Sequence, residues 1–108
     1  MFEAIFGSKA RAKIIKFLFS EPNTYHHLRE IAKVLNLNTN HVKRELDLLE
    51  REHILISSVD GVYKKFTPNK DSQIYSELCS IAHKMADVIG ELKLALKKID
   101  DKIGRAHV

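Results

Sequence analysis

The sequence of 108 residues contains one cysteine, two prolines, four glycines and no tryptophan. Because Cys79 has no second cysteine to pair with, no disulfide can form within the chain, and a reducing compartment is expected. No apolar run approaches the roughly 20 residues that span a membrane, and the first residues lack the basic and apolar segments of a secretory signal. We therefore expect a cytoplasmic protein with a single hydrophobic core.

The sequence also lacks the residue sets that catalysis and metal binding require. It has no glycine-rich loop suited to phosphates and no evident grouping of nucleophile, base and orienting side chain. The Phe6-Gly7-Ser8 stretch is similar to the Gly-Ser signature of nucleotidyltransferases, but no paired aspartates follow it to hold their metal. Among the histidines, only His83 has a suggestive metal-binding partner, Cys79, four residues earlier. We expect no enzymatic activity, no metal, no cofactor and no evident small-molecule effector.

The charge of the chain gives a first indication of its partners. The net charge is +4, and most of the basic excess lies before Pro68. A positive surface favours polyanionic partners such as nucleic acids. The part of the chain before Pro68 is therefore the place to look for such a contact.

Two helices are predicted in the first third of the chain. Ser8 is a suitable N-cap for a helix over residues 9–20, which Pro22 ends. A brief strand at Thr24 and Tyr25 is expected next. The following helix has apolar residues at the spacing of one buried face, namely Leu28, Ile31, Ala32 and Leu35.

A tight turn and a third helix follow. Asn36 suits the left-handed conformation that a sharp turn needs, and Asn38 can cap a helix over residues 39–52. This third helix has a buried seam of Val42, Leu46 and Leu49, which fall within roughly 60° of one another. The two helices and their turn predict a helix-turn-helix.

The third helix presents polar and basic side chains near its N-terminus, namely Thr39, Asn40, His41, Lys43 and Arg44. Asparagine can pair with adenine and arginine with guanine in the major groove, while lysine suits phosphates. These residues are therefore candidate DNA contacts. The alternative is a merely solvated helix face.

A β-hairpin is predicted over residues 54–67, around Asp60-Gly61. We expect Ile54, Ile56, Val62 and Phe66 to cover the core. The remaining side chains near the tip, Tyr63, Lys64 and Lys65, are candidate contacts to the DNA backbone. A hairpin directly after a helix-turn-helix makes a winged helix, so the predicted class is mainly α with a small β-hairpin.

The chain from Asp71 to Lys102 predicts one long helix with a heptad seam typical of a coiled coil. Such a helix spans on the order of 45 Å, longer than the winged module can cover. We therefore expect a winged helix-turn-helix DNA-binding domain over residues 1–69 and an association helix over residues 70–108 that forms a homodimer. The expected dimerisation residues are Ile74, Leu78, Ile81, Met85, Val88, Leu92, Leu96 and Ile99.

Three sequence blocks together resemble the ArsR-like winged helix-turn-helix regulators of archaea and bacteria. They are Phe6-Gly-Ser with Arg11, the LREIA block from Leu28 to Ala32, and the VKREL block from Val42 to Leu46. The resemblance implies a dimeric transcription regulator that binds double-stranded DNA through the helix carrying Thr39 to Arg44. Metal-sensing members carry paired cysteines that this chain lacks, so a metal-sensor role is not implied.

Two other interpretations belong to different classes. The module could have lost DNA binding and act as a protein-interaction adaptor through its C-terminal helix. Some relatives of the ArsR-like sub-group carry a nucleotidyltransferase domain after the winged helix, so the chain could also be the regulatory fragment of such a protein. Binding to duplex DNA discriminates the first of these from a regulator.

Overall fold

The structure, a computed structural model, describes residues 6–85. Three helices and three strands are α2 (Lys9–Ser20), β1 (His26–His27), α3 (Leu28–Leu35), α4 (Thr39–Arg51), β2 (Leu55–Asp60) and β3 (Tyr63–Pro68). A further helix occupies residues 75–85. The predicted seam positions Val88, Leu92, Leu96 and Ile99 lie outside the described residues.

The ends of the helices are defined by local side chains, as the sequence predicts. The Ser8 hydroxyl accepts a hydrogen bond from the Arg11 backbone N–H at 3.2 Å and begins α2. Asn36 ends α3 with φ 55°, the left-handed conformation that its short polar side chain tolerates. Asn38 then caps α4. The predicted bounds of α2 and the predicted helix-turn-helix are confirmed, except that α4 ends at Arg51, one residue before the expected end.

The three strands form one antiparallel sheet in the order β1-β3-β2. β2 and β3 make the predicted hairpin, whose pairing closes at Asp60 and Tyr63, so its two-residue loop is Gly61-Val62. Gly61 has φ 65°, which a side chain would disfavour. The strand expected at Thr24 and Tyr25 is displaced to His26 and His27, where it pairs with β3.

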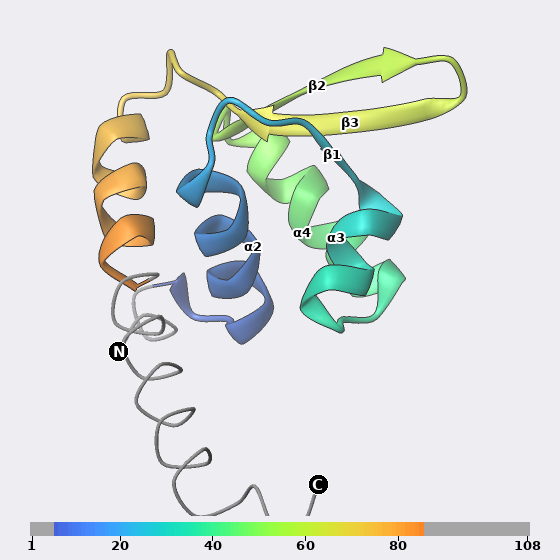
Figure 1. Ribbon diagram of the computed structural model, residues 1–108, viewed down its shortest axis with the longest axis horizontal. Coiled ribbons are helices and arrows are strands. Elements are labelled where there is room, and N and C mark those ends of the chain that lie inside the picture. Colours follow the sequence, from blue (N-terminus) through green and yellow to red (C-terminus); the bar gives the residue numbers. More distant parts are fainter. Residues whose placement is uncertain (1–5, 86–108) are drawn as a thin grey trace, which may run out of the picture.

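The core lies where the helices meet the base of the hairpin. Its largest fully buried side chains include Ile14, Ile15, Leu18, Phe19, Ile31, Val42, Leu46 and Leu55. The helix over residues 75–85 lies alongside α2, on the side away from α3 (Figure 1). Leu78 and Ala82 from this helix join the same core.

The hairpin side chains that are buried differ in part from those predicted from the sequence. Leu55 is buried at 1% exposure, whereas Ile56 is 43% exposed and Val62 is 90% exposed. Figure 1 shows the hairpin reaching past the helices, so Val62 in its end loop has no core beneath it. Ile56 lies near the base, but neighbouring strand residues point to opposite faces, and Leu55 takes the side of the core. Phe66 is buried, and Ile54 packs partly against the core, as predicted. The expectation that Ile56 and Val62 cover the core is wrong.

Candidate nucleic-acid interface

The N-terminal half of α4 presents the predicted contact residues on a fixed helix. Val42, Leu46 and Leu49 are buried, and the exposed side chains on the other side are Thr39, Asn40, Lys43 and Arg44, with His41 half-buried on the flank. The Asn38 Oδ1 atom accepts hydrogen bonds from the backbone N–H groups of Asn40 at 2.9 Å and His41 at 3.2 Å. The cap thus fixes the first turn, whose positive dipole end favours a phosphate.

The wing is tied to α4 through Glu50. The Glu50 carboxylate accepts hydrogen bonds from the Ser57 hydroxyl of β2 and from Lys64 Nζ of β3, the second at 3.0 Å. The Ser57 hydrogen bond and, after it, Lys64 hold the pKa of Glu50 below its ordinary value. This junction holds both strands of the hairpin against the candidate recognition helix.

A groove of about 410 Å³ lies between the wing and the helix-turn-helix. Leu28, Leu46 and Phe66 are among its apolar lining residues, and its polar lining includes Lys43, Tyr63 and Lys64. The structure thus brings together predicted contact residues from α4 and β3 that are about 20 positions apart in the sequence. Lys65, by contrast, is half-buried and pairs with Asp60 at 2.8 Å, so it does not line this groove.

Two further groove residues were not predicted from the sequence. His27 and Arg29, at the start of α3, line the groove with Lys43 and Lys64, and the His27 ring lies 5.4 Å from the Tyr63 ring between centroids. The start of α3 reaches the wing because β1 pairs with β3. Only this long-range pairing could have identified the two residues.

The lysines of this surface are already paired with carboxylates. Lys43 Nζ lies 2.8 Å from Asp47, Lys64 is 3.0 Å from Glu50, and Lys65 is 2.8 Å from Asp60. Lys65 also holds the pKa of Asp60 below its ordinary value. Within residues 6–85, Arg29 and Arg44 have no carboxylate within ion-pairing distance. Compared with the paired lysines of this surface, they are more available to an incoming polyanion.

The described residues of the predicted dimerisation seam differ in how deeply they are buried in this chain. Leu78 is only 4% exposed and belongs to the core of this chain, whereas Ile74 is 43% exposed. Ile81 and Met85 are half-buried and pack against the same core. The first turns of the seam therefore also anchor the helix to its own domain.

Within residues 6–85, no group of three or more histidine, cysteine, aspartate or glutamate side chains could hold a metal ion. No helix of this part is long and apolar enough to cross a membrane.

A helix-turn-helix followed by a hairpin, with a short strand completing the sheet, defines the winged-helix fold. No protein-family model and no curated protein matches the sequence. Solved structures do match. MepR, a transcription regulator of the Staphylococcus aureus multidrug efflux pump MepA, has a TM-score of 0.64 at 18% identity, over 94% of this chain and 83% of its own.

Two more structures show the same fold. The adhesin competence repressor AdcR from Streptococcus pyogenes has a TM-score of 0.64 at 16% identity, over 94% of this chain and 73% of its own. A possible transcriptional regulator from Methanosarcina mazei has a TM-score of 0.58 at 26% identity, over 84% of this chain and 82% of its own. A MepR variant that also matches was solved bound to an oligodeoxyribonucleotide. The neighbours are thus winged-helix transcription regulators, and the ArsR-like sub-group stays a prediction.

Proposed function

We propose that the protein is a transcription regulator that binds specific sequences of double-stranded DNA as a homodimer. The observation that carries the proposal is the arrangement of Asn40, Lys43 and Arg44 on the exposed face of a capped helix beside a wing. The winged-helix fold and the regulators that share it support the same conclusion.

Each element has a separate role in this proposal. The first turns of α4 enter the major groove, where Asn40 and Arg44 can read adenine and guanine. Thr39, Lys43 and the N-terminus of α4 meet phosphates. The hairpin lies along the backbone, where Tyr63, Lys64 and Lys65 add affinity without reading bases.

The dimer is proposed to form through residues 70–108, while residues 1–69 bind DNA. The predicted seam consists of Ile74, Leu78, Ile81, Met85, Val88, Leu92, Leu96 and Ile99. Leu78 is buried in the core of its own chain and supports the dimer by anchoring the helix, while the other seam residues are proposed to meet the second copy. A two-fold dimer would place two recognition helices about 34 Å apart, one turn of the DNA helix.

Selection of bound duplexes from a random pool tests the proposal most directly. We expect a two-fold symmetric motif, and affinity for it that falls steeply as salt rises, because phosphate contacts release counterions. A pool that yields no enriched sequence would refute sequence-specific binding. Absence of any duplex binding at low salt would leave the protein-interaction module as the better account.

A further inference from the structure

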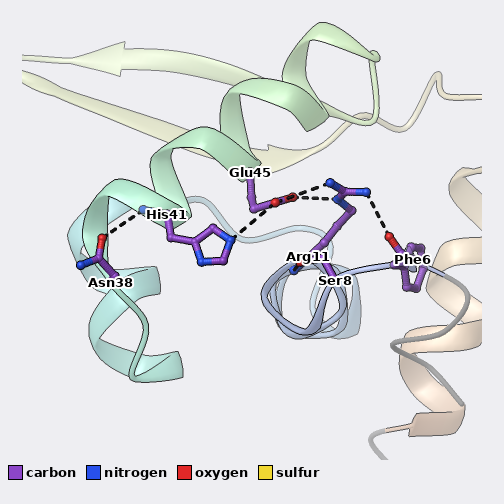
Figure 2. A network of polar contacts seen from close by, with 6 residues as sticks. All are labelled: Phe6, Ser8, Arg11, Asn38, His41 and Glu45. Carbon is purple, nitrogen blue, oxygen red and sulfur yellow. Dashed lines mark hydrogen bonds and ion pairs between the residues drawn. The ribbon is translucent and has the colours of Figure 1, made fainter.

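Arg11 and Glu45 are among the charged residues of the three sequence blocks that have no role in the proposed contacts. Arg11 belongs to the Phe6-Gly-Ser block and Glu45 to the VKREL block. The structure pairs them across α2 and α4: Arg11 Nε lies 2.7 Å from Glu45 Oε1, and Arg11 Nη2 lies 3.5 Å from Glu45 Oε2. Figure 2 shows this pair between the two helices.

The Phe6-Gly-Ser block builds the support for Arg11. Gly7 has φ 71° and turns the chain, and Ser8 begins α2 by accepting from the Arg11 backbone N–H. The Phe6 carbonyl accepts a hydrogen bond from Arg11 Nη1 at 3.0 Å. All three guanidinium nitrogens therefore have acceptors, which only the planar fork of arginine allows.

Glu45 in turn faces His41, which lies one turn earlier on the same helix. Glu45 is 8% exposed and is the only buried carboxylate in the described part of the chain. Its Oε2 atom lies 3.8 Å from His41 Nε2. Figure 2 shows the His41 ring turned toward Glu45 just after the Asn38 cap. Glu45 thus faces the ring, at a distance longer than a hydrogen bond, at the turn of α4 that the proposed function places in the major groove.

We propose that Arg11 and Glu45 are positioning residues for DNA binding, which orient the side chain of His41, itself a candidate DNA contact of α4, without touching DNA themselves. The inference rests on the proposed function. A side chain that is restrained before binding loses less conformational freedom on the DNA, and this is worth about two- to tenfold in affinity. Arg11 also balances the Glu45 charge, which would otherwise repel phosphates.

A double-mutant cycle tests this role in the full chain. Dissociation constants for the selected duplex are measured for the parent protein, Glu45→Gln, His41→Ala and the variant with both changes. Glutamine preserves the shape of the side chain but removes its charge. We expect Glu45→Gln to weaken binding about two- to tenfold more when His41 is present than when it is alanine.

The general loss of a negative charge acts equally in both backgrounds and cancels in this comparison. Glu52→Gln is the matched control, because Glu52 is an exposed residue at the other end of the same helix. We expect no dependence on His41 for that change. A second cycle combines Arg11→Lys with His41→Ala, since lysine retains the charge of arginine but not its planar fork. This cycle tests the positioning role if Glu45→Gln fails to fold.

The outcomes separate the two proposals. Duplex binding with an equal effect of Glu45→Gln in both backgrounds, or a smaller effect when His41 is present, overturns the positioning role and leaves the regulator intact. Failure of the parent protein to bind any duplex overturns the regulator, and the positioning role falls with it.

Discussion

In the proposed function, recognition of a specific DNA sequence depends most on Arg44. It is exposed on α4, and within residues 6–85 no carboxylate lies within ion-pairing distance of it. The guanidinium fork can pair with both acceptors of a guanine edge. Lys43 differs, because Asp47 already neutralises it at 2.8 Å. Arg44 can therefore pair directly with a base, whereas Lys43 must first leave Asp47 before it meets a phosphate.

Replacing Arg44 by alanine should weaken binding to the selected site by about 1–3 kcal/mol and relax sequence preference. Competition between the selected duplex and a scrambled duplex measures both effects. The matched control is Arg51→Ala, at the C-terminal end of the same helix, which should leave the preference unchanged. An equal loss on both duplexes would instead make Arg44 a phosphate contact.

Replacing Asp47 by asparagine should strengthen binding to duplexes of any sequence. The change frees Lys43 from its ion pair and removes a carboxylate from the groove, so one more phosphate can be neutralised. The slope of log affinity against log salt should steepen by about one unit. Asp71→Asn, an exposed change outside the groove, provides the comparison. An unchanged slope would contradict this role of Asp47.

At the scale of elements, the helices were predictable and the sheet was predictable only in part. Helix ends depend on residues close in sequence, so Ser8, Asn36 and Asn38 correctly gave the start of α2, the end of α3 and the start of α4. The helix expected from Asp71 begins later, at residue 75, because residues 70–74 form turns. The position of β1 depends on pairing with β3, some 40 residues later, and no local pattern contains that information. The candidate contact residues of α4 could be predicted from the sequence, but the groove residues His27 and Arg29 could not.

The junction between α4 and the wing should depend on pH through Glu50. Its pKa is lowered in the folded protein, so its stabilising contribution is present above the ordinary value of 4.5 and is lost as pH falls through the lowered value. The unfolding free energy of the parent protein should exceed that of Glu50→Gln near neutral pH. The difference should vanish in acid, as denaturant titrations across this range would measure. Glu52→Gln should show no such difference, and a constant gap at every pH would contradict the assignment.

At the scale of the whole molecule, the helix over residues 75–85 belongs to the domain that carries α4. Leu78 and Ala82 are buried in the common core, and the Tyr75 ring lies 6.1 Å from the Phe19 ring between centroids. The heptad pattern predicted the helix but could not show which of its residues face the chain's own core. That division depends on the packing of α2 against the helix.

Two leucine changes should therefore have different effects. Leu78→Ala should reduce the unfolding free energy by about 2–5 kcal/mol, because it opens a cavity in the core. Leu92→Asp should make the protein monomeric in sedimentation, since a charge in the proposed seam disfavours pairing, while the fold of residues 6–85 persists. A monomeric parent protein at all concentrations would refute the dimer.

The ion pairs of Lys43, Lys64 and Lys65 have a consequence for how the protein would search a genome. Attraction to arbitrary DNA depends on free positive charge, and a chromosome offers roughly a million or more competing sites. A lysine that must first leave a neighbouring carboxylate contributes less to that attraction than an unpaired one. A regulator built in this way would be retained less at the wrong sites, and a smaller number of copies would suffice to occupy the right one.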